Sequence, residues 1–156
     1  MEFGNEGIKR PSWTLEFTSA EQHEILSLLS MIISAIPVIA VSSSAKAEDY
    51  YCRVLGFQKV FAHRPDPAKP DPCYLGVARD GVTLHLESFR SERAGKTSAF
   101  LWVSDVDHLY QEISTRGANT QMAPTDQTWG NRETHIRDQD GNALCFASKP
   151  TNVDLP

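Results

Sequence analysis

The sequence is poor in cysteine and lacks the motifs that mark several classes of enzyme. Its 156 residues include only three cysteines, Cys52, Cys73 and Cys145, which are widely spaced and odd in number. There is no CxxC and no Cys/His zinc spacing, which favours a reduced, cytoplasmic protein over one built on disulfides. A glycine-rich phosphate loop, an HExxH motif and a Ser/His/Asp order are also absent, so no catalytic residue is predicted.

Excess positive charge is absent as well. The formal net charge is −5, with 40% hydrophobic and 22% charged residues and no low-complexity tract. This balance is typical of one folded domain, or of two small modules that share a core. It argues against a nucleic-acid surface or an anionic membrane as partner, and it is compatible with a cationic small molecule.

The longest apolar stretch, residues 26–47, has two interpretations. Its basic upstream residues and its Ala-Lys-Ala end resemble a secretory signal peptide, whose removal would delete the strand predicted at 36–41. Glu21 and Glu24, however, stand where a signal peptide is normally basic. The apolar residues of 18–34 recur with helical spacing, and the β-branched run Ile36–Val41 then has the length of a strand. We therefore expect an amphipathic helix followed by a strand.

An internal repeat sets the organisation that we expect. Residues around Val41-Ser42 match those around Val103-Ser104, and further matches recur at offsets of about 60 to 62 residues. Gly56 and Gly117 stand where the two predicted helices end. Each half thus has the order strand, helix, further strands. We predict one domain over 35–148, made of modules 36–89 and 98–148, with an N-terminal helical extension (1–34) and a C-terminal tail (149–156).

With this repeat, the sequence resembles the vicinal oxygen chelate (glyoxalase/bleomycin resistance/dioxygenase) superfamily, and within it the bleomycin resistance proteins. The residues that carry the resemblance are Ala35–Val38, Leu55–Phe57, Thr83–Leu86, Ser98–Val103, Trp129–Glu133 and Arg137–Asn142. Asn131 interrupts the family's usual Trp-Gly-Arg-Glu. The resemblance implies an α+β fold of paired βαβββ modules that form an open, cup-shaped sheet. It also implies a homodimer whose first strands are exchanged around the early proline, here Pro37.

The resemblance also allows a test for a metal enzyme. Metal-dependent members carry ligands at four places, which correspond here to Ile36, His85, Ser98 and Cys145. Isoleucine cannot coordinate a metal and serine is a poor ligand, whereas a catalytic site needs about three protein ligands. We therefore predict no metal and no cofactor, with His85 lining the cup, Cys145 a small buried residue, and Glu87 the only shifted alternative ligand.

The remaining polar candidates have simpler interpretations. The other histidines are expected at exposed positions without a catalytic role; they are His23, His63, His108 and His135. The segment Asp138–Asn142 resembles the start of a calcium loop but lacks the remaining ligands, and Asp-Gly between two strands is typical of a hairpin turn.

Aromatic residues supply the predicted ligand-binding surface. Phe100 and Trp102 alternate on one strand, a pattern that usually marks core, and at least one ring of the set is expected to be buried, with Trp102 the candidate. Trp129 lies in the polar stretch DQTWGN, where a ring is well placed to stack on a planar ligand. The predicted ligand-binding residues are Phe61, His85, Phe100, Trp102, Trp129 and Arg132.

The function that the resemblance implies is stoichiometric binding without catalysis. A planar, cationic glycopeptide antibiotic would be sequestered in a groove at the interface of a homodimer, with rings at the positions of Phe100 and Trp129 flanking its heteroaromatic tail. Two alternatives stay open. One is a binding or sensing relative for another planar, hydrophobic molecule, and the other is a metal-dependent enzyme of the glyoxalase or dioxygenase type.

Overall fold

The computed structural model describes residues 18–20 and 31–150, and the chain separates into two compact units, residues 1–35 and 36–156. In the first unit Ser19 and Ala20 are helical, and residues 31–35 lie outside helices and strands. The helix predicted over 18–34 is wrong at its end, because residues 31–34 are not helical, and its residues 21–30 lie outside the described residues. Within the described part of the chain, no helix combines the length and apolar character needed to cross a membrane.

The second unit contains the same order of elements twice. The first module consists of β1 (Val38–Ala40), helix α2 (Ser44–Asp49) continued by the π-helical turn η1 (Tyr50–Val54), β2 (Gln58–His63), β3 (Tyr74–Arg79) and β4 (Val82–Glu87). A short 3-10 turn, η2 (Ser91–Arg93), leads to the second module. That module consists of β5 (Ser98–Trp102), α3 (Val106–Thr115), β6 (Asn119–Asp126), β7 (Arg132–Arg137) and β8 (Ala143–Ser148).

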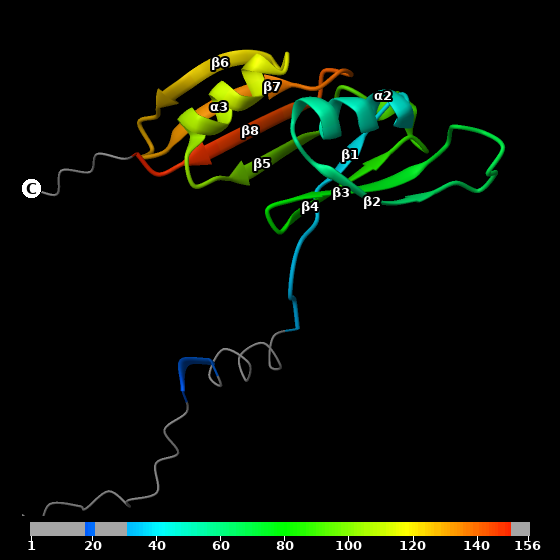
Figure 1. The fold of residues 1–156 in the computed structure, drawn as a ribbon, viewed down its shortest axis with the longest axis horizontal. Coiled ribbons are helices and arrows are strands. Elements are labelled where there is room, and N and C mark those ends of the chain that lie inside the picture. Colours follow the sequence, from blue (N-terminus) through cyan, green and yellow to red (C-terminus); the bar gives the residue numbers. More distant parts are fainter. Residues whose placement is uncertain (1–17, 21–30, 151–156) are drawn as a thin grey trace, which may run out of the picture. The chain divides into compact units, whose positions relative to one another are not determined.

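Each module forms one four-stranded sheet with the same topology (Figure 1). The strand orders are β1-β4-β3-β2 and β5-β8-β7-β6, and in each sheet the first strand of the module runs parallel to the last. The other neighbours are antiparallel. The predicted α+β fold of paired βαβββ modules with open sheets is therefore confirmed. The first strand is shorter than the expected 36–41, because ladder pairing covers only Val38–Ala40.

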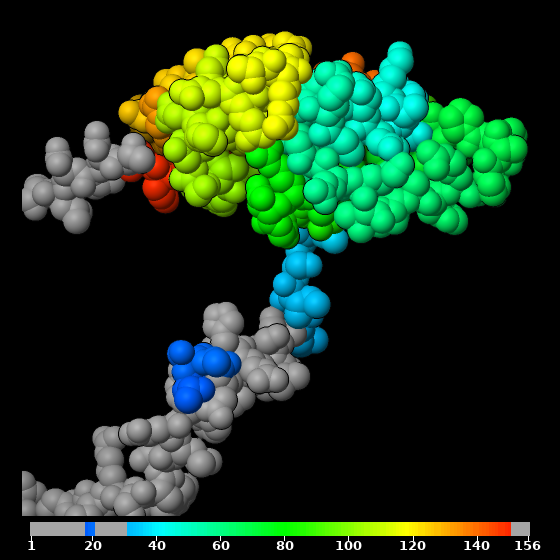
Figure 2. Space-filling model, in the orientation of Figure 1, coloured from blue at the N-terminus to red at the C-terminus, as the bar shows by residue number. Residues whose placement is uncertain are grey.

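The helices and one face of each sheet form a single core that both modules share. The first module supplies Ile39, Val41, Tyr51 and Leu55, and the second supplies Leu101, Val106, Ile113 and Phe146. Figure 2 shows that side chains of the two modules also adjoin at the molecular surface. On β5 the residues Ala99 and Leu101 are buried, whereas Ser98, Phe100 and Trp102 are exposed. The face of the sheet opposite the core is therefore open and carries large aromatic side chains.

A buried polar link joins the two modules. The hydroxyl of Tyr51 donates to Asp138 Oδ2 (3.1 Å), and Asn142 Nδ2 donates to both Asp138 Oδ2 and the carbonyl of Ala40 (2.8 Å each). Asn142 Oδ1 in turn accepts from the backbone and side chain of Thr97. Because Asp138 and Asn142 are buried, these bonds replace the water that each polar group loses on folding.

The turn that contains Asp138 is the hairpin predicted from the sequence. Asp138 Oδ1 accepts hydrogen bonds from the backbone N–H groups of Asp140 and Asn142, and Gly141 has a positive φ of 93°. Side-chain bonds to the loop's own backbone stabilise such turns. One oxygen of the Asp138 carboxylate thus bonds to the backbone of its own turn, as expected for a hairpin between β7 and β8.

Removal of the Tyr51 hydroxyl tests this link. Burial, followed by the charge of Asp138, raises the pKa of Tyr51 well above its usual value. Tyr51→Phe should lower the free energy of unfolding by about 1.5–3 kcal/mol, the scale of a hydrogen bond to a charged group. Because the pKa of Tyr51 is raised, the folded protein also keeps the hydroxyl proton at an alkaline pH at which the unfolded chain loses it. The free energy of unfolding should therefore fall as the pH rises above about 10, and fall less in Tyr51→Phe.

Urea denaturation between neutral pH and pH 11 measures both effects. Tyr110→Phe serves as the matched control, because Tyr110 is half-buried on α3 and lies outside the link; its effect should stay within about 0.5 kcal/mol. Equal effects of the two substitutions would show that the link does not stabilise the fold.

Candidate ligand-binding site

An aromatic group lies on the open face of the first sheet. Phe61 on β2, Tyr74 on β3 and His85 on β4 have ring centroids 5.2 to 6.3 Å apart, and the Phe61 and Tyr74 rings are stacked. The Tyr74 hydroxyl lies 3.1 Å from His85 Nδ1. The structure therefore brings together the predicted residues Phe61 and His85 and adds Tyr74, which the sequence analysis did not single out.

A glycine makes room for this group. Gly76 is the register partner of both Phe61 and His85. A Cβ placed on Gly76 would lie 2.2 Å from Phe61 Cε1, far inside contact distance, so the Phe61 ring can lie over the strand only because residue 76 has no side chain. This requirement was invisible in the sequence, where Gly76 follows Leu75 within an ordinary strand pattern.

The second sheet carries its own aromatic pair on β5. Phe100 and Trp102 are 49% and 54% exposed, and their rings meet edge to face at 5.4 Å. Lys149 Nζ lies 5.1 Å from the centre of the Trp102 ring, a cation–π distance. The expectation that at least one ring of the predicted aromatic set is buried is wrong, because all four rings, Trp102 included, are exposed. The core uses the intervening residues Ala99 and Leu101, so strand alternation places both rings on the open face.

Trp129 occupies the turn between β6 and β7, as its polar surroundings indicated. Its side chain is 65% exposed, and its Nε1 donates to Glu133 Oε1 (2.8 Å), which also accepts from Asn131 Nδ2 (3.2 Å). The turn is closed by the backbone bonds Gly130 N to Gln127 O and Gln127 N to Asn131 O. The ring is therefore presented to solvent while its edge is fixed to a buried carboxylate.

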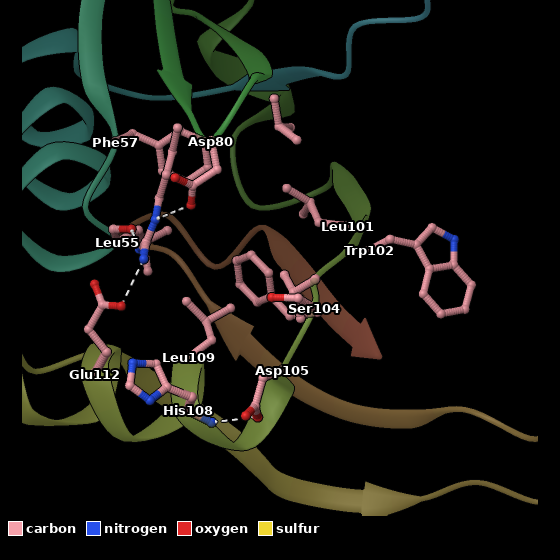
Figure 3. Close-up of a pocket in the computed structure, with 14 residues that line it drawn as sticks. Leu55, Phe57, Asp80, Leu101, Trp102, Ser104, Asp105, His108, Leu109 and Glu112 are labelled. Atoms are coloured by element: carbon pink, nitrogen blue, oxygen red, sulfur yellow. Dashed lines mark hydrogen bonds and ion pairs between the residues drawn. The ribbon is translucent and has the colours of Figure 1, made fainter. Parts of the chain in front are cut away.

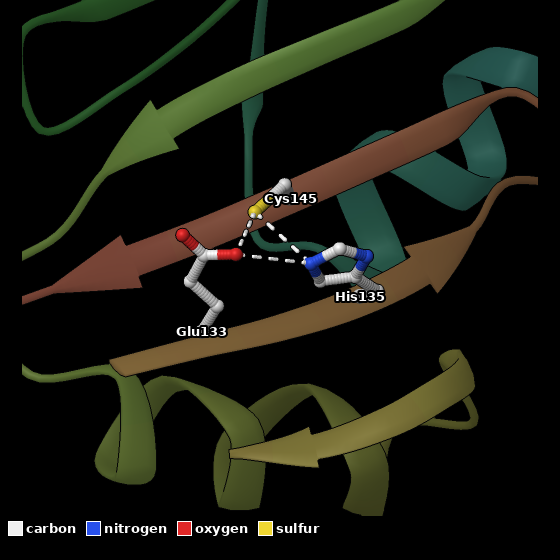
Figure 4. Close-up of side chains that lie close together, drawn as sticks. All are labelled: Glu133, His135 and Cys145. Atoms are coloured by element: carbon white, nitrogen blue, oxygen red, sulfur yellow. Dashed lines mark hydrogen bonds and ion pairs between the residues drawn. The ribbon is translucent and has the colours of Figure 1, made fainter. Parts of the chain in front are cut away.

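Glu133 is the hub of a polar group on the same sheet. Glu133 Oε2 lies 3.3 Å from His135 Nε2 and 3.6 Å from Cys145 Sγ. His135 Nε2 and Cys145 Sγ are themselves 3.4 Å apart (Figure 4). Burial alone would raise the pKa of Glu133, but hydrogen bonds from Trp129, Asn131, His135 and Cys145 outweigh it and lower the pKa. Burial and the charge of Glu133 raise the pKa of Cys145 to about 12.

This group corrects two expectations from the sequence. Cys145 is half-buried and in contact with polar atoms, so it is not a plain buried residue. His135 is exposed as predicted, but it is not isolated, because it is the register partner of Cys145 on the neighbouring strand. These two residues are ten positions apart in the sequence, and only the pairing of β7 with β8 brings them together.

Arg132 is held by carboxylates. Its Nε and Nη2 donate to the two oxygens of Asp107 (2.7 and 2.9 Å), and its Nη1 donates to Asp126 (3.0 Å). Hydrogen bonds to Asp107 and Asp126 raise the pKa of Arg132, and the same contact lowers the pKa of Asp107. Arg132 thereby connects β7 to helix α3 and to β6, next to the turn that carries Trp129.

A separate cavity of about 490 Å³ lies on the opposite side of β5, between the β3–β4 turn and α3 (Figure 3). Leu55, Phe57 and Leu109 form part of its apolar wall, and the ion pair between Arg79 Nη2 and Glu112 Oε2 (2.7 Å) borders it. Figure 3 shows the indole of Trp102 directed away from the other lining side chains. Trp102 thus belongs to both surfaces, because it pairs with Phe100 and also lines the edge of this cavity.

Comparison with known proteins identifies the family. The family described as the Glyoxalase/Bleomycin resistance protein/Dioxygenase superfamily matches residues 33–146. The chain therefore belongs to this superfamily, and the resemblance found in the sequence is confirmed. A search of curated proteins found no match to the chain.

Solved structures agree with this assignment. The bleomycin-binding protein from bleomycin-producing Streptomyces verticillus, solved with copper(II)-bleomycin, is 25% identical with a TM-score of 0.63, covering 78% of this chain and 99% of that chain. TnmS3, an antibiotic binding protein from Streptomyces sp. CB03234, is 26% identical with a TM-score of 0.60, covering 78% and 100%. A superfamily member from Sphaerobacter thermophilus DSM 20745 is 26% identical with a TM-score of 0.58, covering 75% and 98%.

The four places that hold a metal in metal-dependent members do not form a ligand set here. Ile36 precedes β1, and the residue paired with His85 is the equally apolar Val38. In the second sheet the partner of Cys145 is Phe100, and Ser98 lies two residues away along the strand. The shifted alternative, Glu87, is buried and bonded to Arg90 (2.9 Å). The residues at these places do not fit a catalytic metal.

A double-mutant cycle tests the role of Gly76. In the wild-type background Gly76→Ala should lower the free energy of unfolding, because the added methyl collides with the Phe61 ring. In a Phe61→Ala background the same change should be neutral or stabilising by up to about 1 kcal/mol, since alanine is favoured over glycine inside a strand. Urea denaturation should give a coupling of about 1–2 kcal/mol. The same effect of Gly76→Ala in both backgrounds would contradict the assigned contact.

Proposed function

We propose that this protein is a binding protein without catalytic activity that sequesters a planar, cationic antibiotic of the bleomycin type. The ligand lies in a groove formed by the open faces of the sheets in a homodimer, in the cytoplasm. The solved structures that the chain resembles include proteins described as bleomycin-binding and antibiotic binding. Sequestration requires only that the complex is tight, because no bond in the ligand is made or broken.

The observation that carries this proposal is the exposure of large rings on the open faces of both sheets. Phe61 is 40% exposed, Phe100 and Trp102 are about half exposed, and Trp129 is more exposed still. Exposed apolar rings grouped on a sheet, as in the Phe100 and Trp102 pair, are costly in water and commonly mark a binding site. Flat rings on a rigid sheet lose little entropy when a planar molecule stacks on them.

The charge beside Trp129 suits a cation, whereas Trp102 already has Lys149 over its ring. The chain has a formal net charge of −5. Glu133, whose pKa is lowered, stays ionised at neutral pH directly beside Trp129. The positive end of a ligand would thus be attracted to the position where its aromatic part stacks. Arg132 enters the proposal as a positioning residue, since Asp107 and Asp126 already occupy its guanidinium.

The absence of catalysis is proposed from the chemistry of the strongest candidate nucleophile. Cys145 lies 3.4 Å from His135, which is a geometry used for activated thiols. Its pKa of about 12, however, keeps the thiol protonated at neutral pH, because the carboxylate of Glu133 opposes the thiolate. A protonated thiol is a weak nucleophile. Binding by the aromatic face therefore accounts for the site better than covalent chemistry does.

The proposed dimer follows from the same open faces. Within the single chain described, β1 is paired with β4 along Val38–Ala40. Ile36, just before it, is 42% exposed beside Pro37 and is available to a second copy. Light scattering should give the mass of a dimer at micromolar concentration. Ile36→Glu should shift the equilibrium toward monomer, because a charge placed in an apolar contact is expensive.

A matched control for the dimer is Val82→Glu, which adds the same charge at an equally exposed apolar residue on β4, beside a different turn. It should leave the mass unchanged. A wild-type monomer at these concentrations, or equal effects of the two substitutions, would count against the proposed interface.

Substitution of Trp129 tests the stacking role. Trp129→Ala should weaken the binding of bleomycin by about 1–3 kcal/mol, or roughly 5- to 150-fold in Kd, the scale of one lost stacked ring. Trp129→Phe keeps a ring but removes the N–H bond to Glu133 and should retain most of the affinity. Both changes should cost about 1 kcal/mol of stability, the worth of one hydrogen bond. Tryptophan fluorescence and calorimetric titrations measure the affinities.

Phe89→Ala provides the control, because Phe89 is exposed at 45% but belongs to neither aromatic group. Its affinity should match that of the wild type. Binding of other planar ligands with no binding of bleomycin would favour the alternative of a relative for another planar molecule. Unchanged affinity in Trp129→Ala for every planar ligand that binds the wild type would contradict the stacking role.

A further inference from the structure

Three donor atoms of different chemistry converge on the open face of the second sheet. They are a carboxylate oxygen of Glu133, the Nε2 of His135 and the thiol sulfur of Cys145, and all lie within 4.8 Å of one another. Figure 4 shows the side chains directed toward one another from two adjacent strands, β7 and β8. Within the described residues this is the one group of at least three such side chains close enough to share a metal ion.

We propose that Glu133, His135 and Cys145 form a binding site for a divalent metal ion of the zinc type. The site shares only Cys145 with the four positions that hold a metal in metal-dependent members, because Glu133 and His135 lie on β7. It does not rest on the proposed antibiotic binding, and it can be tested without any antibiotic.

The spacing of the donor atoms fits a tetrahedral ion. Zinc binds nitrogen and oxygen at about 2.0–2.1 Å and sulfur at about 2.3 Å. Tetrahedral angles then place the nitrogen and oxygen donors about 3.3 Å apart, and the sulfur about 3.5 Å from each of them. The structure has 3.3 Å from Glu133 Oε2 to His135 Nε2, 3.4 Å from that nitrogen to Cys145 Sγ, and 3.6 Å from the sulfur back to the oxygen. All three distances between donor atoms agree with one ion that lies above the plane of the three atoms and contacts each of them.

The ligands are held in place before any ion binds. Trp129 Nε1 and Asn131 Nδ2 both donate to Glu133 Oε1, which leaves Oε2 directed at the other two donors. His135 and Cys145 are register partners in the interior of the ladder between β7 and β8. Groups that orient a metal ligand in this way typically change the affinity 10- to 100-fold when they are removed.

The fourth coordination position is open. The side chain of His135 is about half exposed, and His135 and Cys145 line a cavity of about 360 Å³ together with Phe100 and Gln121. A water molecule or a donor atom of a bound ligand has room there. Three protein ligands and one open position are the arrangement of zinc sites that exchange a ligand, as opposed to closed structural sites.

The donor set selects the class of ion. A thiolate, a carboxylate and a neutral imidazole together carry two negative charges, which a divalent ion neutralises. Sulfur and imidazole favour zinc, cobalt or nickel, whereas magnesium and calcium prefer oxygen ligands alone. Binding must displace the thiol proton, so the site releases protons when it fills.

Cobalt(II) is the direct probe, because a thiolate bound to cobalt gives a charge-transfer absorption in the near ultraviolet. The reduced full-length protein, stripped with a chelator, should take up one equivalent of cobalt per chain with this absorption. Zinc should displace the cobalt, and a large excess of magnesium or calcium should not. Cys145→Ser should abolish the absorption, and His135→Ala and Glu133→Gln should each weaken cobalt binding at least tenfold. Zinc affinity is measured separately by competition with a chromophoric chelator.

Matched controls separate this site from others in the chain. Cys52→Ser removes a half-buried thiol elsewhere, and His85→Ala removes the histidine of the first sheet, so both should bind cobalt like the wild type. Circular dichroism of each metal-free variant checks its fold, and the exposed His135 gives a variant that should fold normally. No thiolate–cobalt absorption in the wild type, absorption that survives Cys145→Ser, or binding that needs His85 and not His135 would overturn the proposal.

Discussion

The arrangement of the two modules depends on the buried hydrogen bonds between Asp138, Asn142 and Tyr51. The turn between β7 and β8 supplies the first two residues, and they reach the helix and the first strand of the other module. Buried polar groups have low energy only when all their partners are in place, so this link fixes one relative position of the modules. The shared apolar core provides most of the stabilisation, and the polar link determines which packing is adopted.

This constraint decides which surfaces are left for function. Helices cover one face of each sheet, and the aromatic residues Phe61, Phe100 and Trp102 stand on the other. Local features then shape the open faces: the missing side chain of Gly76 admits the Phe61 ring, and buried Glu133 holds the edge of Trp129. The same carboxylate faces His135 and Cys145 with its second oxygen. A single buried charge thus links the proposed stacking residue to the proposed metal site.

Much of the fold could be predicted from the sequence because the internal repeat and the turn residues are local signals. Gly56 and Gly117, with φ of 76° and 90°, follow the two helices as expected, and the Asp138–Asn142 hairpin was correct. What failed was the expectation that one of the predicted aromatic rings is buried, since alternation along β5 is identical whichever side is buried. The cluster of Glu133, His135 and Cys145 depends on the register of β7 against β8, which no local pattern specifies.

Sedimentation of the protein with bleomycin, followed by chemical analysis of the released ligand, is the most direct test of binding without catalysis. The absorbance of the drug should sediment with the protein at the rate of a dimer, and the drug recovered after denaturation should be chemically unchanged. Drug absorbance that does not move with the protein boundary would contradict binding. A drug that is released in altered form would contradict sequestration and point to an enzyme.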